Sequence, residues 1–335
     1  MAEVKERPLV AVVGANTLLA RELRGLLDTA NPAPRVQLIS ATADGAAILS
    51  ADEDEPVVMT PLAAESLEGS RVAFLVGSPA SSRRTLKVNP AGGPALIDLT
   101  AALEEQPHAR LRAPRAEPLR TTARLGPGEI QVIAHPAAIA ITMILSRLAS
   151  IAGIRRSIIH IFEPASERGQ KGLDELQQQT VAVLSFQKLK TDVFDAQLAF
   201  NVLARYGEEA LEPLEGVEQR LEKHLASLLS AYPRIPMPSL RLIQAPVFHG
   251  HSFSIWVEFD ENPGAGALAR GLAEAGVEVR SDDPPSNAGI AGQSGLSVGA
   301  IADDRNHPRA CWLWLVVDNL RLAAENALAV AREAL

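Results

Sequence analysis

The strongest constraint on the fold is an apolar strand that a glycine joins to a helix near the start of the chain. Residues 9–13, LVAVV, are all apolar, as in a strand buried on both faces of a parallel sheet. Gly14 follows, and the leucines after it recur with helical spacing. A parallel strand needs neighbouring strands and helices on both faces, so this unit predicts a doubly wound α/β sheet.

More strand-like runs follow in the first part of the chain, separated by helical or loop segments. We therefore expect residues 1–133 to form one domain on a parallel sheet. Residues 104–129 are rich in Pro, Arg and Glu, so we expect a surface excursion there, with the basic run Arg110–Arg124 as a solvated loop. The strand-like runs are residues 35–40, 71–77, 95–100 and 130–136.

The second half of the chain changes character and predicts an α+β domain on a mostly antiparallel sheet. Residues 239–259 are expected to form a strand, a tight bend near Gly250 and a second strand. We place this domain at residues 134–317 and expect the last helix, 318–335, to return to the first domain. Other strands are expected at 154–162 and 309–317, a helix at 171–189, and a helix followed by a strand at 266–280.

The length, net charge and cysteine count of the chain exclude several classes of protein. A chain of 335 residues is longer than one core usually reaches, which favours two domains. The net charge of −8 argues against a nucleic-acid surface. There is no uncharged apolar run of about 18 residues, and the single cysteine excludes an internal disulfide and a cysteine zinc cluster. We expect a cytoplasmic protein that binds no membrane, nucleic acid or metal.

Gly14 lies where a phosphate could bind, because the free N–H groups and the dipole of a helix N-terminus favour negative charge. A dinucleotide fingerprint needs further glycines, since the backbone must approach the pyrophosphate closely. Thr17 and Ala20 stand at those positions. Two interpretations stay open: NADP or NAD binds weakly through Gly14, Asn16 and Thr17, or the strand and helix are kept only for packing.

Two histidines and one thiol are the other candidates for chemistry. His249 and His251 lie two apart, so on an extended strand both would point to one face as metal ligands, although no third ligand is obvious. His251 could instead act as a general acid and base, or be held by hydrogen bonds in a sheet. Cys311 lies in an apolar strand that should keep its thiol buried and inert, with Trp312 and Trp314 in the core.

Taken in order, several stretches resemble aspartate-semialdehyde dehydrogenase over nearly the whole chain. The resemblance implies a Rossmann-type NADP-binding domain with a doubly wound parallel sheet. It also implies an α+β domain with a mixed, mostly antiparallel sheet, which carries catalysis and the interface of a homodimer or higher oligomer. The matching stretches are residues 10–27, 95–103, 132–143, 167–176, 245–259, 296–301 and 316–328.

The resemblance breaks at the residue that the family's reaction needs most. That reaction runs through a cysteine in an N-P-x-C-x-T motif, whose thiolate forms a covalent thioester and later leaves. Here the motif becomes His135, Pro136, Ala137 and Ala138, so that Ala138 stands at the nucleophile's position. A methyl group can neither attack a carbonyl nor leave.

Other positions of the resemblance change as well. His251 matches the family's acid and base, but the arginine that binds the substrate carboxylate is replaced by Gln244, which cannot form an ionic pair. The family's phosphate-binding arginine is replaced by Glu104, which reverses the charge. The segment Asp318–Arg321 is retained, and the resemblance makes Asn319 a cofactor-binding position.

These losses predict a catalytically inactive relative that keeps the fold and acts by binding or oligomerisation. Its partner would be a second copy of itself or an active paralogue. The alternative is an oxidoreductase that still binds NADP or NAD and uses His251 in altered, non-covalent chemistry. A third hypothesis is a homodimeric structural protein without a ligand.

Overall fold

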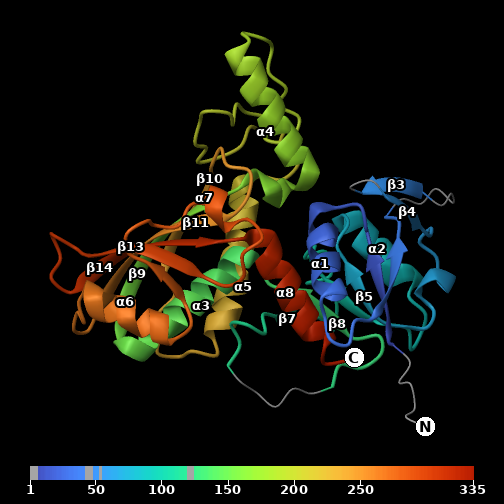
Figure 1. Ribbon diagram of the computed structural model, residues 1–335, viewed down its shortest axis with the longest axis horizontal. Helices are drawn as coiled ribbons and strands as arrows, with labels where there is room; N and C mark the ends of the chain where they lie inside the picture. Colours follow the sequence, from blue (N-terminus) through green and yellow to red (C-terminus); the bar gives the residue numbers. More distant parts are fainter. Residues whose placement is uncertain (1–6, 42–47, 53–54, 119–123) are drawn as a thin grey trace. The chain divides into compact units, whose positions relative to one another are not determined.

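The computed structural model divides into two compact units, and Figure 1 labels the helices and strands of each. The first unit comprises Met1–Ala134 with Ala323–Leu335, and the second comprises His135–Leu322. Each unit has a sheet of six strands, and the first also has an antiparallel pair, β3 (Ile48–Asp52) with β4 (Glu55–Met59). The structure describes residues 7–41, 48–52, 55–118 and 124–335.

The large sheet of the first unit is parallel throughout, with strand order β2-β1-β5-β6-β8-β7. The order reverses between β1 and β5, which is the switch point where doubly wound folds bind their ligands. Helices α1 (Leu18–Asp28) and α2 (Pro79–Val88) follow these two strands. The predicted doubly wound sheet is therefore confirmed. Its strands are β1 (Leu9–Val13), β2 (Arg35–Ile39), β5 (Ser70–Leu75), β6 (Ala95–Asp98), β7 (Arg110–Arg112) and β8 (Ile130–Ile133).

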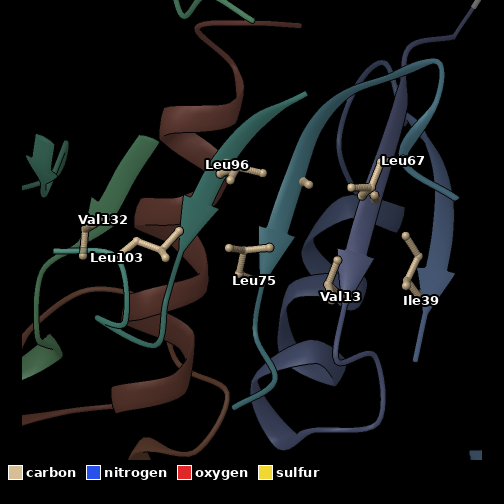
Figure 2. Packing of buried hydrophobic residues seen from close by; sticks show 9 residues of the cluster. Val13, Ile39, Leu67, Leu75, Leu96, Leu103 and Val132 are labelled. Atoms are coloured by element: carbon tan, nitrogen blue, oxygen red, sulfur yellow. The ribbon is translucent and has the colours of Figure 1, made fainter. Parts of the chain in front are cut away.

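Apolar side chains from neighbouring strands, with Leu67 and Leu103 from the connections between them, pack into one cluster on this sheet (Figure 2). Burying one such side chain contributes about 1.5–3 kcal/mol, so the cluster is a main source of the unit's stability. Because the strands are covered on both faces, their sequences are continuous apolar runs rather than alternating ones. The labelled members are Val13, Ile39, Leu67, Leu75, Leu96, Leu103 and Val132, each at most 1% exposed.

The prediction of a solvated loop over the basic run is wrong for its first residues. Residues 110–112 form β7, the edge strand that pairs in parallel with β8. Arg112 is largely buried there because two carboxylates compensate its charge: Nη2 lies 2.7 Å from Glu333 Oε1, and Nε lies 3.1 Å from Glu117 Oε1. Residues 119–123 of the run lie outside the described residues.

The sheet of the second unit is mixed, with order β10-β9-β11-β14-β13-β12. Its central pairs are antiparallel and its two outer pairs parallel, which confirms the predicted mostly antiparallel sheet. Helix α3 (Pro136–Ile151) contacts α5 (Leu214–Leu229), α6 (Ala265–Glu274) and β9, so these helices form one layer against the sheet (Figure 1). The strands are β9 (Ile154–Glu163), β10 (Ser239–Gln244), β11 (His251–Phe259), β12 (Glu278–Arg280), β13 (Ser297–Asp303) and β14 (Ala310–Val317).

Strands β10 and β11 do not pair with each other, although they are neighbours in the chain. Both pair with β9, β10 in parallel and β11 antiparallel. The bend between them lies at Gly250, whose φ of +82° favours glycine, and β11 begins only at His251. The premise that His249 and His251 share one strand face is therefore wrong, because His249 precedes the strand.

The face of this sheet opposite the helical layer carries apolar and aromatic side chains. The strand register puts Ile158, Trp256 and Trp312 in one row across three strands. Ile158 is 41% exposed and Trp312 is 38% exposed. The prediction that Trp312 lies in the core is thus wrong, since a strand's alternate side chains point to opposite faces and this one points to the uncovered face.

Helix α4 (Gly169–Leu184) stands away from the sheet of its unit (Figure 1), and two buried polar side chains tie the following loop to it. Glu175 accepts hydrogen bonds from the amides of Val193 and Phe194. The amide of Gln179 bonds four backbone groups between residues 190 and 199. These bonds fix the start of the loop that carries Tyr206 and Glu212 towards the candidate site.

Candidate functional site

In the first unit, the loops after β1 and β5 are in direct contact at the switch point. Gly14 has a φ of +90°, and a Cβ atom there would lie 2.3 Å from the Cα of Gly77. Only glycine fits such an approach. Thr17 also links the two loops, because its hydroxyl donates a hydrogen bond to the carbonyl of Val76 at 2.8 Å.

Several amides that a pyrophosphate would use already have partners within this unit. Thr17 is the N-cap of α1, and its Oγ1 accepts from the amide of Ala20 at 3.2 Å. The amides of Gly14 and Ala15 donate to the carbonyl of Ile39. Asn16 is exposed at the tip of the turn. The turn therefore satisfies most of its own donors, unlike a glycine-rich turn that presents them to a phosphate.

Glu104, at the position of the family's phosphate-binding arginine, lies half-buried in the turn that follows β6. The carboxylate of Asp98, at the end of β6, holds this turn by accepting from the amides of Thr100 and Leu103. Burial raises the pKa of Asp98, and these hydrogen bonds act against that shift. The turn is thus ordered by its own carboxylate.

In the second unit, the start of α3 brings Ala138 into the position predicted for a nucleophile. Ala138 lies in the first turn of the helix and is fully buried. His135 caps the helix, because its Nδ1 accepts from the amide of Ala137 at 3.2 Å, and its own amide donates to Nδ1 of His224 at 2.9 Å. The local geometry is therefore that of an ordered helix start in which the side chain of residue 138 is a buried methyl group.

Cys311 lies far along β14 from the residue that pairs with His251. It pairs with Val257, six positions along β14 from the pair formed by Val317 and His251. At about 3.4 Å per residue, that separation is about 20 Å. The thiol is buried and donates to Asn262 and Asp303, and burial raises the pKa of Cys311 to about 12. The predicted burial of the thiol is confirmed, and a raised pKa disfavours the reactive thiolate.

His251 is fully buried at the start of β11 and faces a carboxylate and a second imidazole. Its Nδ1 lies 3.9 Å from Glu167 Oε1, and the rings of His251 and His135 are 5.7 Å apart. Among the described residues, neither ring nitrogen of His251 has a hydrogen-bond partner. Burial lowers the pKa of His251 to about 3, and the positive charge of Arg168 adds to this shift. The imidazole is therefore neutral at ordinary pH.

Gln244, where the resemblance expects an arginine, is fully engaged by its neighbours. Its Nε2 donates to the carbonyls of Glu163 and Ala245, and its Oε1 accepts from the hydroxyl of Tyr206 at 2.5 Å. The amide is fully buried. Gln244 therefore joins the ends of β9 and β10 and holds Tyr206, and none of its polar atoms is left for a ligand.

The guanidinium of Arg168 lies beside Glu163 and Tyr206. The sequence did not predict this side chain at the site. Its Nη2 lies 2.9 Å from Glu163 Oε1 and 3.4 Å from the hydroxyl of Tyr206. Its Cζ lies 5.5 Å from the centre of the Tyr206 ring, and its Nη1 lies 3.5 Å from Glu212 Oε2. Burial raises the pKa of Glu163 to about 7, while Arg168 acts to lower it. The only sequence signal was a charged pair, Glu167 and Arg168, just after a buried strand.

Asn319, at the start of α8 (Asn319–Ala331), ties three segments of the second unit together. Its Nδ2 donates to Glu167 Oε1 at 2.7 Å, and its Oδ1 accepts from the amide of Gly250 at 3.1 Å. Both groups also bond the hydroxyl of Ser166. The amide that the resemblance assigned to a cofactor thus holds the loop after β9 against the start of β11.

The described residues contain no group of three His, Cys, Asp or Glu side chains that could hold a metal ion. His249, the second histidine considered as a ligand, is half-buried in the bend before β11. Among the described helices, none combines the length and apolar character needed to cross a membrane.

Comparison with known proteins assigns the chain to a family. Residues 145–322, more than half of the chain, match the family model described as semialdehyde dehydrogenase, dimerisation domain. A USG-1 protein homolog from Pseudomonas aeruginosa is 30% identical over 94% of both chains. The chain belongs to the semialdehyde dehydrogenase family. The resemblance found in the sequence is confirmed, and with it the fold class.

Solved structures extend the likeness to the whole chain. A probable aspartate-semialdehyde dehydrogenase from Pseudomonas aeruginosa has a TM-score of 0.82 at 28% identity and covers 97% of this chain and 98% of its own. The aspartate-semialdehyde dehydrogenase of Candida albicans, solved with NADP, has a TM-score of 0.70 at 17% identity and covers 98% of both chains. At that identity the second likeness concerns the fold alone.

The buried, neutral imidazole of His251 predicts a specific sensitivity to acid. Its pKa of about 3 in the folded state lies below the ordinary value of 6.5, so between these values only the unfolded chain takes up the proton. Stability is therefore lost as the pH falls below about 6.5. Between pH 8 and pH 5 the wild type should lose about 2 kcal/mol more unfolding free energy than His251→Gln. Urea unfolding at both pH values measures the difference.

The comparison of two proteins at two pH values cancels the titration of shared groups that the substitution does not affect. His249→Gln, which removes an imidazole from the bend before β11, serves as the matched control. Equal losses in the wild type and in His251→Gln would contradict a neutral, buried imidazole at this position.

Proposed function

We propose that this protein is a non-catalytic member of its family and acts by binding and self-association. The observation that carries the proposal is the fully buried Ala138 at the start of α3, where the family resemblance expects the cysteine. A methyl group cannot form the thioester on which that reaction depends. The chain's single cysteine, Cys311, lies about 20 Å along β14 from Val317, the residue that pairs with His251.

The replacement of the arginine that would bind the substrate carboxylate supports the same proposal. Gln244 is neutral and all of its polar atoms are engaged, so it offers no pair to a substrate carboxylate. Arg168 supplies a charge close by, but Glu163 and Glu212 already neutralise it. Loss of a covalent nucleophile costs several powers of ten in kcat in enzymes with such chemistry, and here the binding group is altered as well.

We infer that the first unit has lost most of the family's affinity for NADP. The residues present do not fit the pyrophosphate, because Thr17 and Ala20 add side chains where the backbone would have to approach it. The hydroxyl of Thr17 also occupies the amide of Ala20 and bonds Val76 across the switch point. Asn319, the other position considered for the cofactor, is engaged in the second unit. No step of a reaction is therefore assigned to a nicotinamide.

A non-covalent oxidoreductase that relies on His251 is not favoured. A general acid or base works best when its pKa lies near the working pH, and the pKa of His251 is about 3. The imidazole could accept a proton only weakly and would hold no second proton to donate.

We propose that the protein forms a homodimer through the uncovered face of the second sheet. The support is the row of exposed apolar side chains on that face, including Ile158 and Trp312. The neighbouring rings of Phe162 and Trp314, 5.9 Å apart, extend the same face. A second copy would cover it symmetrically, and the matching family model is itself a dimerisation domain. The comparisons give no support to a hetero-oligomer with an active paralogue.

Turnover of aspartate semialdehyde tests whether the protein is non-catalytic. The wild type should show no oxidation of aspartate semialdehyde above background in an assay of NADPH formation with phosphate. Ala138→Cys should remain inactive as well, because Gln244 still offers no charge to the substrate. An active family member, assayed in parallel with and without its catalytic cysteine, shows how much turnover the cysteine contributes. Turnover by the wild type would overturn the proposal.

The second prediction concerns NADP. Calorimetry should detect no binding to the wild type at millimolar concentration. The double variant Thr17→Gly/Ala20→Gly should bind at least tenfold more tightly, because it frees the amide at residue 20 and opens the approach to the turn. Thr29→Gly, at the other end of α1, is the control. Micromolar binding by the wild type would contradict the inference.

The third prediction concerns assembly. Light scattering after size-exclusion chromatography should give a dimer for the wild type at micromolar concentration. Trp312→Glu should give a monomer, since a buried, unpaired carboxylate would be costly in the interface. Val58→Glu changes a side chain that is 61% exposed in the first unit and should leave the dimer intact. A monomeric wild type, or a dimeric Trp312→Glu, would exclude this interface.

A further inference from the structure

Helix α4 and the loop that follows it carry exposed apolar side chains. Val181 and Leu184 are exposed on one face of the helix, and Phe186, just beyond its end, is 98% exposed. Farther along the loop, Phe200 is 64% exposed and Val202 is exposed as well. Exposed apolar side chains that gather on one segment mark an interaction site, whereas scattered single ones do not.

The two phenylalanines of this segment also have an unfavourable backbone conformation. Phe186 has a φ of +53°, and Phe200 has a φ of +60°. Residues with bulky side chains rarely adopt this left-handed region, which favours glycine. Burial within the chain does not offset the cost, since both rings are largely exposed.

The hydrogen bonds at the end of α4 show why glycine would be favoured at position 186. The amide of Phe186 donates to the carbonyl of Val183, and the amide of Gln187 donates to the carbonyl of Ala182 at 2.8 Å. This pair of bonds is the Schellman motif, whose left-handed position is usually glycine. Backbone strain of this kind is concentrated at functional positions, so the ring of Phe186 is expected to have a function.

The backbone that precedes Phe200 is held in place by a buried amide. Oε1 of Gln179 accepts from the amides of Leu198 and Ala199 at 2.7 Å and 3.1 Å. Gln179 is itself fully buried on the inner face of α4. An apolar side chain on a backbone that is already ordered loses less conformational entropy when it binds a partner.

Helix α4 lies on the side of the second sheet opposite α3 and α6, which is the uncovered side (Figure 1). Its exposed apolar residues therefore lie on the same side of the unit as the face that carries Ile158 and Trp312. A second copy of this chain that covered that face would come next to α4 and its loop.

We propose that the α4 arm, residues 169–202, docks on a second copy of this chain, with Phe186 and Phe200 as its apolar anchors. Aromatic side chains are enriched in the cores of protein interfaces, where their burial replaces contact with water. The inference rests on the proposed homodimer and extends its interface from the sheet face to the arm.

The variant Phe186→Gly separates the backbone of this residue from its ring. Sedimentation equilibrium of the full-length chain should show a dimer about tenfold weaker than that of the wild type, because the anchoring ring is lost. In the monomeric background of Trp312→Glu, the same change should leave the urea midpoint of unfolding unchanged or raise it, because glycine relaxes the backbone. Weakening of the dimer by less than threefold would overturn the proposal. So would a lowered midpoint, which would mean that the ring packs within its own chain.

Two further variants complete the test. His108→Gly is the matched control, because it relaxes a φ of +65° and removes an exposed ring in the first unit. It should leave the dimer unchanged, and weakening equal to that of Phe186→Gly would overturn the proposal. Phe200→Gly should weaken the dimer as Phe186→Gly does, and an unchanged dimer would overturn its assignment as an anchor.

The homodimer and the arm can fail separately. A monomeric wild type would overturn the proposed homodimer and this inference with it. A dimer that Trp312→Glu dissociates and Phe186→Gly leaves intact would overturn only the arm. The non-catalytic function is tested by turnover and is independent of both results.

Discussion

The buried guanidinium of Arg168 is the constraint on which the arrangement of the second unit's site depends. A buried charge must be paired, and here Glu163, Glu212 and the ring and hydroxyl of Tyr206 surround it. Tyr206 in turn bonds Gln244, which holds the ends of β9 and β10 together. The polar groups at this end of the sheet are thus hydrogen-bonded to one another.

This internal network of polar side chains is distinct from the apolar cores that hold the family's fold. The sheet cores depend on apolar burial. The site depends on particular atoms at particular places, and these can be exchanged while the scaffold stays intact. Belonging to the semialdehyde dehydrogenase family therefore fixes the architecture here and leaves the activity to be decided by the site.

The same pattern recurs at the switch point of the first unit. Gly14 is retained because the close approach of Gly77 demands it, which is a requirement of packing. Thr17 and Ala20 occupy positions whose glycines serve a pyrophosphate, and Thr17 uses its hydroxyl to cap α1 and to bond Val76. The backbone thus requires glycine at Gly14, whereas Thr17 and Ala20 stand where the resemblance expects further glycines.

The sequence by itself determined the two kinds of sheet, the methyl group at position 138 and the burial of the thiol of Cys311. Apolar periodicity reports burial directly, and a methyl group at position 138 has the same chemistry in any fold. Only the tertiary structure decided that residues 110–112 form an edge strand, that β10 and β11 flank β9, and that Trp312 faces outwards. It also decided that Tyr206 meets Gln244, 38 residues away, and that Gln244 meets Glu163, 81 residues away. Such contacts join distant segments and leave no periodic trace in the chain, because their partners are chosen by packing and charge compensation after the strands have assembled.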